Sequence, residues 1–359
     1  MAYRISRDAL CAFAQRLLET GGMEAAKASV VAELLTRTDE MGVTTHGTSL
    51  IPYYLPELKS GAMTATGIHE VVTDTGVTMV WDGNYLPGHW LMTQALDTCI
   101  PRARDHGIVT LALRRSHHIG CLSTLTRIAA DQGLVCLIAT SDPAGAWVAP
   151  YGGVEPVLTP NPFAIGYPGG DHPVLIDTCA SITTVSKMRE HINTGTSFAH
   201  PWMLDGQGHA TADPTVVKAD PPGTILPVGG LDHGHKGFAL ALMVEMLTQG
   251  LAGHGRADHP TRWGANVYLQ VMDPAAFGGA DAFAAQVGHL NDRCRTSTPA
   301  RPDAPVRIPG DRVQAALAAA AADGIVLPEE VWTRLRACAV EMGIPLPDDD
   351  STPTRKDTP

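Results

Sequence analysis

Histidines in glycine-containing turns are the side chains of this chain best suited to acid–base chemistry. One of them, His46, lies in Thr45-His46-Gly47, at the end of a segment that also contains Gly42. A histidine in a turn keeps its ring free to exchange protons near neutral pH, and glycines let such a turn approach a ligand closely. A His-Gly pair is also ordinary in loops, so His46 is a candidate proton donor or acceptor that needs a partner.

A second histidine turn has the same character. Ser116-His117-His118-Ile119-Gly120 follows a predicted strand over residues 109–113, and ligands of α/β sheets collect beyond the carboxyl ends of strands. Adjacent residues on an extended chain point to opposite sides, so at most one of His117 and His118 is expected to face a given pocket. A structural histidine at a helix start is the competing interpretation, and a metal site would need a third ligand from elsewhere.

Two further segments carry groups that could bind a ribose or a phosphate. Asp177 closes a buried strand, and Thr178 and Ser181 add hydroxyls in the next turn, although Asp and Ser are also the usual helix N-caps. His235 and Lys236 lie at the predicted start of a long apolar helix. A lysine beside the backbone amides of a helix N-terminus forms a natural anion site, while a solvated lysine in a flexible glycine loop is the alternative.

Composition and charge restrict the class of protein. The chain has 359 residues, with 44% hydrophobic and 18% charged residues, and its formal charge is 26 − 37 = −11. An acidic chain without a basic stripe is a poor candidate for binding nucleic acid or an anionic membrane surface. Its seven cysteines contain no Cys-x-x-Cys pair, which indicates reduced thiols. The N-terminus lacks the apolar core of a signal peptide, and no segment approaches the ~20 apolar residues that cross a bilayer. We expect a cytoplasmic protein.

Hydrophobic periodicity predicts an α/β fold between flanking helices. A helix capped by Ser6 ends at Gly21-Gly22, and a second runs over residues 23–37, whereas residues 51–56 contain too many prolines for a regular long helix. Short buried strands are predicted over residues 77–81, 108–113, 134–139 and 174–176, with helices over 90–106 and 122–132 between them. Helices are also predicted over 236–251, over 312–322 and from Pro328 onward in a mostly helical C-terminal third.

This pattern divides the chain into four parts. Residues 1–75 form a helical region with the His46 turn, and residues 76–310 form an α/β core that includes the cofactor-binding region. Residues 311–346 form helices that pack back on the N-terminal region, and the polar, proline-containing residues 347–359 form a disordered tail. No Gly-x-Gly-x-x-Gly follows a predicted strand, and Walker-type and Gly-x-Ser-x-Gly motifs are also absent, which disfavours a standard dinucleotide-binding domain and a hydrolase nucleophile elbow.

These blocks, taken in order and at these intervals, resemble the malate/L-lactate dehydrogenase family that is unrelated to Rossmann-type dehydrogenases. The resemblance rests on Thr45-His46-Gly47, the Ser116–Gly120 turn, the strand that begins at Asn161-Pro162, and His235-Lys236-Gly237. It covers nearly the whole chain. The family implies a non-Rossmann α/β fold with a mixed sheet and flanking helices, a bound NAD or NADP, and a homodimer with the active site at the subunit interface.

The resemblance also implies roles for individual residues. His46 matches the proton donor to the substrate, and His118 matches the histidine that borders both nicotinamide and substrate. The remaining matched positions fall into two groups. The cofactor contacts implied are Gly120, Asp177, Thr178, Ser181, His235, Lys236, Gly310 and Asp311. The substrate contacts implied are Ser116, Asp142 and Trp147.

Three positions depart from the family pattern. The family often has an arginine three residues after the His-Gly pair, suited to a bidentate grip on a carboxylate, but Leu50 stands there. Arg37, Arg114 or Arg115 could take its place, or the substrate lacks a carboxylate at that point. The stretch over residues 141–147 is longer than usual, and Trp147 could narrow the pocket. The family's Gly-Lys after the aspartate turn is Ser186-Lys187 here.

The leading hypothesis is therefore an NAD(P)H-dependent oxidoreductase that interconverts a 2-oxo acid and a 2-hydroxy acid, with a small-molecule substrate and no metal. Reduction of a cyclic imine carboxylate is the close variant, because the same hydride and proton would reduce a C=N bond. A metal hydrolase or lyase built on His117, His118, His233 and His235 is an alternative of another class, but these histidines lack supporting ligand spacing. A degenerate family member that only binds ligands is the third reading, with Leu50 as its one hint.

Overall fold

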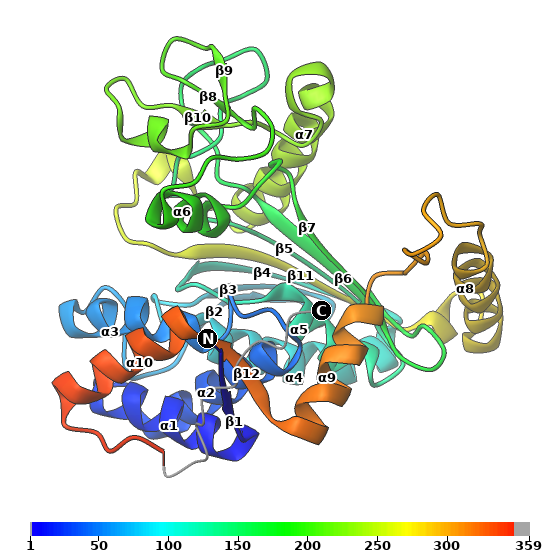
Figure 1. Ribbon diagram of the computed structural model, residues 1–359. Coiled ribbons are helices and arrows are strands. Elements are labelled where there is room, and N and C mark those ends of the chain that lie inside the picture. The colour runs from blue at the N-terminus through cyan, green and yellow to red at the C-terminus, as the bar shows by residue number, and fades with distance from the viewer. Residues whose placement is uncertain (1, 348–359) are drawn as a thin grey trace.

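The computed structural model describes residues 2–347 and is built around a seven-stranded mixed sheet (Figure 1). The strands lie in the order β2-β3-β4-β11-β5-β6-β7. Only β3 and β4 pair in parallel; every other neighbouring pair is antiparallel. Their bounds are β2 Glu70–Asp74, β3 Thr78–Asp82, β4 Ile108–Ser116, β5 Val135–Ser141, β6 Pro162–Tyr167, β7 Val174–Cys179 and β11 Ala265–Met272. The α/β class with a mixed sheet is confirmed.

The four strands predicted from buried runs correspond to β3, β4, β5 and β7. The central strand was not among them. β11 (Ala265–Met272) pairs on one side with β4 and on the other with β5. It lies in the third of the chain that periodicity assigned mostly to helices, and the polar residues Asn266 and Gln270 interrupt its apolar run. The expectation of a mostly helical C-terminal third is therefore corrected by this strand.

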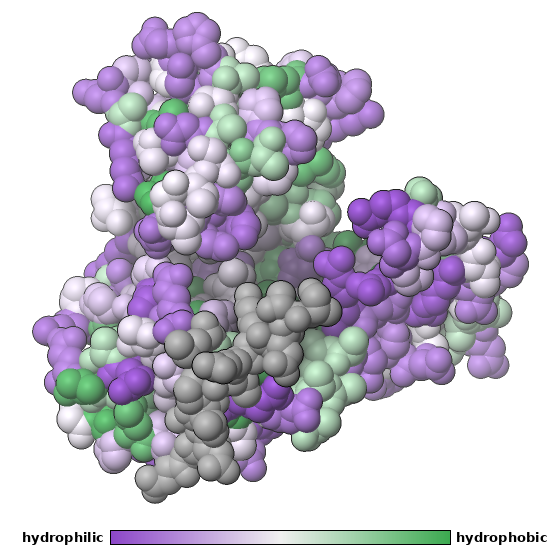
Figure 2. All heavy atoms as spheres, in the orientation of Figure 1, coloured by the Kyte–Doolittle hydropathy of each residue, from purple (hydrophilic) through white to green (hydrophobic). Residues whose placement is uncertain are grey.

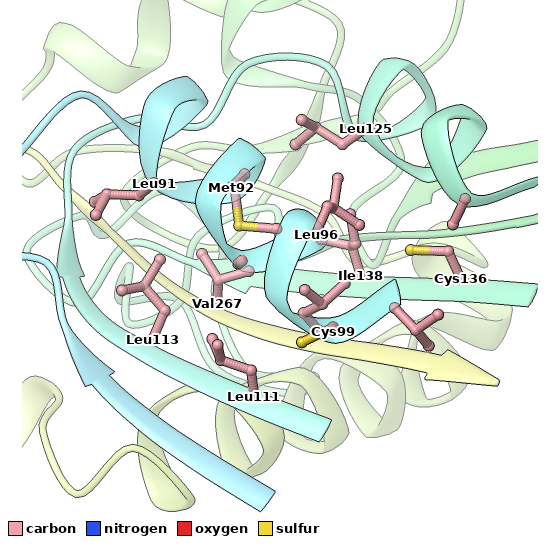
Figure 3. Close-up of a cluster of buried hydrophobic side chains, with 14 of the residues drawn as sticks. Leu91, Met92, Leu96, Cys99, Leu111, Leu113, Leu125, Cys136, Ile138 and Val267 are labelled. Atoms are coloured by element: carbon pink, nitrogen blue, oxygen red, sulfur yellow. The ribbon is translucent and has the colours of Figure 1, made fainter. Parts of the chain in front are cut away.

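Helices cover the two faces of the sheet unequally. α4 (Gly88–His106) and α5 (Leu122–Ala130) pack on one face, where Leu96 and Leu125 meet Ile138 and Val267 in the main core (Figure 3). α7 (Gly230–Glu245) and the π-helical turn Met246–Gly250 pack on part of the other face. Successive residues of a strand point to opposite faces, so both sides of the sheet are buried where these helices lie.

The N-terminal helices form a layer with the C-terminal one. α1 (Arg7–Thr20), α2 (Ala25–Glu40), α3 (Ile51–Ser60) and α10 (Glu329–Met342) share one core, and β1 (Ala2–Ile5) pairs antiparallel with β12 (Ile325–Pro328). Ser6 caps α1 by accepting from the N–H of Ala9 at 3.3 Å, as predicted. α3 is a ten-residue helix, contrary to expectation: Pro52 occupies its first turn, where the missing N–H costs nothing.

A separate lobe stands above the sheet in Figure 1. It contains α6 (Val185–Thr194) and a small sheet of β8 (Met203–Leu204), β9 (Ala210–Thr211) and β10 (Thr224–Ile225). α8 (Ala280–Arg295) lies to one side, followed by α9 (Asp311–Asp323). Short 3-10 turns span Thr48–Leu50, Pro214–Lys218, Arg256–Asp258 and Pro274–Ala276. Figure 2 shows the surface hollowed between the upper lobe and the segment that carries α8.

The four-part division of the chain stays a prediction, and the tail expected beyond Pro347 lies outside the described residues. In residues 2–347, no helix has the length and apolarity needed to span a membrane.

Candidate active site

The end of α2 sets the position of His46. The His46 N–H donates to the carbonyl of Val43 at 3.0 Å. Just beyond it, Oδ2 of Asp39 accepts from the N–H of Thr48 at 2.9 Å and from its hydroxyl at 2.6 Å. Gly42 has a φ of +76° and needs to be glycine. Gly47 has a negative φ of −89°, and it needs to be glycine because a Cβ there would overlap the carboxylate of Asp39. The backbone freedom expected of Gly47 is thus replaced by a need for space.

His118 lies next to His46. Their rings are nearly parallel, at 24°, with centroids 6.2 Å apart. The turn that carries His118 follows β4 and closes at Gly120, whose φ is +74°. His118 is partly exposed, whereas His117 is fully buried, with Nε2 3.5 Å from a carboxylate oxygen of Glu57. Only His118 of the adjacent pair therefore lies beside His46.

Three residues that the sequence did not single out complete this cluster. The hydroxyl of Tyr54 on α3 lies 2.7 Å from Nδ1 of His118. Trp263 lies beside His118, with ring centroids 5.1 Å apart. His89, near the start of α4, is buried under Gly120, where a Cβ would overlap its Nε2. Tyr54 was hidden in a segment judged too rich in proline for a helix, and Trp263 comes just before the unpredicted β11.

Burial keeps these histidines neutral. It lowers the pKa of His46, moves the pKa of His118 well below the usual value, and lowers the pKa of His89 to about 3. Burial also raises the pKa of Tyr54 well above 10, so its hydroxyl keeps the proton and can donate to Nδ1 of His118 or accept from it. Where Tyr54 donates, neutral His118 carries its own proton on Nε2.

Asp177 is the acidic residue whose charge acts on His46. It lies on β7, and its Oδ2 accepts from the N–H of Ser123 at 2.8 Å. Its charge raises the pKa of His46, against the larger lowering by burial. Asp177 is exposed to solvent, yet the surrounding protein raises its own pKa by desolvation.

The turn after β7 packs against the start of α7. The Val228 N–H donates to the carbonyl of Ala180 at 2.8 Å, and a Cβ at Gly237 would overlap the backbone of Val228. Thr178 is exposed on this side. Ser181 is buried instead, and its hydroxyl donates to the carbonyl of Thr183 at 2.6 Å. The hydroxyl of Ser181 therefore braces the turn.

α7 begins at Gly230, six residues before the predicted start at Lys236, but it is kinked at His233, which has non-helical angles. His235 and Lys236 are exposed just past this kink. An exposed ammonium group near a helix start, held close to the turn after β7, suits the phosphates of a dinucleotide. The residues present here therefore fit NAD(P), with Lys236 as a phosphate partner and Thr178 as a neighbouring hydroxyl.

Gly310 and Asp311 lie at the other end of β7. The Leu175 N–H donates to the carbonyl of Pro309 at 3.2 Å. Asp311 is held by Arg295 at 2.7 Å and lies 3.1 Å from Nε2 of His172. These three side chains line an open depression of about 510 Å³. Asp311 thus pairs with Arg295 and His172 in a depression at the other end of β7 from Asp177 and Thr178.

The three expected substrate contacts differ in accessibility. Ser116 is fully buried, and its hydroxyl donates to the carbonyl of His117 at 2.7 Å. Trp147 packs in the upper lobe, with the guanidinium of Arg189 5.7 Å from its ring. Asp142 is partly buried, which raises its pKa to about 6. Of these three, Asp142 is the side chain best placed to meet a ligand.

The side chains at the positions that depart from the family pattern, and the two neighbouring arginines considered as substitutes, already make other contacts in the structure. Leu50 is 7% exposed and belongs to the core of the N-terminal layer. Arg114 and Arg115 both donate to the buried carboxylate of Asp82, at 2.8 and 2.7 Å. Lys187 pairs with Glu190 on α6 at 2.8 Å. None of these four residues offers a free cation where the family's arginine and lysine are expected.

The metal-enzyme alternative finds no support in the arrangement of ligands. His233 and His235 lie together, with ring centroids 6.1 Å apart. Across residues 2–347, however, no group of three or more His, Cys, Asp or Glu side chains is placed to hold a metal ion.

Known proteins match the chain over nearly its full length. The family model for malate/L-lactate dehydrogenase matches residues 5–336. The L-lactate dehydrogenase of Cupriavidus necator is 31% identical over 96% of this chain and 99% of its own. The L-sulfolactate dehydrogenase of Methanothermobacter thermautotrophicus is 29% identical, over 96% and 98%. The malate dehydrogenase structure from Entamoeba histolytica shares the fold, with a TM-score of 0.89, 23% identity, and coverage of 97% and 100%.

The chain belongs to the malate/L-lactate dehydrogenase family, as its motifs indicated. It is an NAD(P)-dependent dehydrogenase that acts on CH–OH groups, of the 2-hydroxy acid type.

Proposed function

We propose that this protein interconverts a 2-hydroxy acid and a 2-oxo acid, with His46 as the group that exchanges the hydroxyl proton. One observation carries the proposal: a partly buried His46 lies beside His118 and feels the charge of Asp177. A neutral imidazole can accept a proton, and a nearby carboxylate stabilises the imidazolium that results.

In the direction of oxidation, His46 takes the proton of the substrate hydroxyl, and Asp177 stabilises the charged ring. In the reverse direction the same ring returns the proton to the carbonyl oxygen. With Tyr54 as the donor to its Nδ1 at 2.7 Å, neutral His118 would carry its proton on Nε2 and act as a hydrogen-bond donor to the substrate. When bound, NAD(P) accepts or supplies the hydride. Lys236 and Thr178 would hold the cofactor, with Gly120 and His235 as further contacts, and Gly310 and Asp311 at the other end of β7 stay expected contacts from the family resemblance.

The grip on the substrate's carboxylate differs from the usual family pattern. Leu50 is a core residue, and Asp82 binds Arg114 and Arg115. Of the three arginines considered from the sequence as carboxylate-binding groups, Arg37, in the last turn of α2, is the one not bound to Asp82. We infer that carboxylate recognition relies less on a bidentate pair at the His46 turn than in relatives that keep the arginine.

Replacement of His46 tests the proposal. We expect His46→Ala to lower kcat by about 10²–10⁴-fold, the usual share of a general acid–base group. The Kd for NADH or NADPH, measured by fluorescence titration, should change less than about threefold, because His46 exchanges a proton and does not hold the cofactor. His209→Ala is the matched control, since His209 is an exposed histidine in the upper lobe.

An equal loss of cofactor binding in His46→Ala would assign His46 a structural role. Full turnover in the variant would remove it from the reaction. Retained cofactor binding by the wild-type protein without turnover on any acceptor would favour the ligand-binding alternative.

We further propose that the protein works as a homodimer. α7 and the turn after it leave an apolar face open to solvent, at positions spaced as one side of a helix. Its members are Leu242, Met243, Met246 and Leu251, each 41–53% exposed. An exposed apolar face of this kind marks an interaction surface, and it lies on the helix that carries Lys236.

A further inference from the structure

We propose that Asp39 is a positioning residue that holds the His46 turn in its working geometry. The inference rests on the role proposed for His46 and adds a second residue to the same site. Asp39 lies in the last turn of α2, 4% exposed, seven residues before His46.

Two hydrogen bonds connect this carboxylate to the far side of the turn. Its Oδ2 accepts from the N–H of Thr48 at 2.9 Å and from the hydroxyl of Thr48 at 2.6 Å. Thr48 is itself fully buried and starts the 3-10 turn that leads into α3. The two bonds therefore close a loop, with Asp39 at one end, Thr48 at the other, and His46 between them.

The turn is shaped around the carboxylate. A Cβ at Gly47 would overlap Oδ1 and Cγ of Asp39, so the backbone after His46 lies directly against this group. The φ of Gly47 is negative, and the space taken by the carboxylate is what requires glycine there. The geometry thus couples the side chain of Asp39 to the backbone adjoining His46.

The arrangement is unfavourable for stability alone. Oδ1 of Asp39 is buried without a hydrogen-bond partner among the described residues, and an unsatisfied buried polar atom is costly. Burial also raises the pKa of this carboxyl to about 7. An apolar side chain would avoid this cost, but it would leave the N–H and hydroxyl of buried Thr48 without their acceptor. Placement of the turn is a function that an apolar side chain could not perform.

Variants of Asp39 and Thr48 test the inference, with turnover and cofactor Kd measured side by side at pH 8. We expect Asp39→Ala to lower kcat at least about 30-fold, because a displacement of about 1 Å can cost 10²-fold in rate. The cofactor Kd should stay within about twofold. Asp39→Asn retains an oxygen that can accept from Thr48 and should restore kcat to within about fivefold of wild type.

Thr48→Val and Thr48→Ser give a second, milder comparison if Asp39→Ala fails to fold. Valine removes only the hydroxyl donor and should lower kcat, whereas serine keeps the donor and should retain activity. Asp213→Ala is the matched control. Asp213 accepts from the N–H and the hydroxyl of Thr215 at 2.8 and 2.7 Å, but it lies on the surface of the upper lobe. Its loss should leave kcat unchanged.

The solvent isotope effect separates positioning from a purely structural role. Misplacement of His46 slows proton transfer, so the effect of D₂O on kcat should rise in Asp39→Ala and in Thr48→Val. Folded variants with kcat within twofold of wild type would overturn the inference, as would a loss of kcat that Asp39→Asn fails to restore. If His46→Ala itself remains active, the proposed function fails instead, and the two failures are thereby distinguished.

Discussion

At the scale of single residues, the site combines four histidines whose pKa values burial lowers, and one carboxylate that opposes the shift at His46. His118 and His89 would each repel a proton on His46, whereas Asp177 attracts one. His117 lies further inside, beside Glu57. The cluster is therefore neutral at physiological pH, and Asp177 is the nearby group that favours protonation of His46.

This balance predicts the pH dependence of oxidation. The pKa of His46 is lowered from its ordinary 6.5, so the neutral, proton-accepting ring persists as pH falls toward 6.5. We expect kcat/KM for hydroxy acid oxidation to stay level through neutral pH and to fall below 6.5, where the ring protonates. Asp177→Asn removes the favourable charge and should move the midpoint lower still. Rates measured from pH 5 to 8 with saturating cofactor check both shifts. A midpoint above pH 7 would contradict this assignment.

The limit of sequence reasoning is visible at this scale. His46 and His118 stood out because turns with glycine and histidine are rare enough to notice. Tyr54, His89 and Trp263 contact the same cluster, but they come from a helix with two prolines, a helix start and a loop. Their convergence depends on tertiary packing, and periodicity carries no trace of it. Ser116 and Ser181 are residues of the expected type whose hydroxyls bond to the adjacent backbone.

At the scale of elements, the cofactor side depends on how closely α7 approaches the turn after β7. Gly237 lies at that contact, where a Cβ would overlap the backbone of Val228 and come within 2.8 Å of the carbonyl oxygen of Ala180. Both neighbours are backbone atoms and cannot rotate away. The start of α7, which carries Lys236, can therefore lie this close to the turn after β7 because Gly237 has no side chain.

Gly237→Ala tests this contact. Alanine favours a helix by about 1 kcal/mol over glycine, so helix propensity alone would stabilise the variant. We expect the opposite: a lower Tm and a cofactor Kd raised at least about tenfold, because α7 must shift away. Gly288→Ala in α8 is the control, since a Cβ there meets nothing within 4 Å. A stabilised Gly237→Ala protein with unchanged Kd would show that the contact is not needed.

Helices and strands were predicted correctly where the sequence carries a clear cap residue or a continuous apolar run. Ser6 marks the start of α1, and buried apolar runs mark β4 and β5. β11 was missed although it is central, because its two polar residues look like the edge of a strand or a loop. Asn266 is buried and donates to the carbonyl of His254, a partner that only the folded chain provides.

At the scale of the whole molecule, the sheet joins a helical layer below to a small lobe above (Figure 1). The candidate site draws on all of these parts: His46 comes from the helical layer, His118 from the turn after β4, Asp177 from the sheet, and Lys236 from α7. The apolar face of α7 is where the proposed second subunit would pack.

Met246→Glu tests that assembly. A charge placed on this face should weaken a dimer, because burying an unpaired carboxylate is costly. We expect light scattering to show a shift from dimer toward monomer, with cofactor Kd raised as α7 loses its support. Val340→Glu, at an exposed position on α10, should leave the mass unchanged. A monomeric wild-type protein with full activity would exclude the dimer as the working form.

The most direct test of the central claim is turnover of the purified protein. NADH and NADPH are supplied separately with a panel of 2-oxo acids and cyclic imine carboxylates, and cofactor oxidation is followed by absorbance at 340 nm. We expect at least one 2-oxo acid to be reduced, and the corresponding 2-hydroxy acid to be oxidised in reverse. Binding of neither cofactor, or activity confined to imines, would contradict the proposed 2-hydroxy acid function.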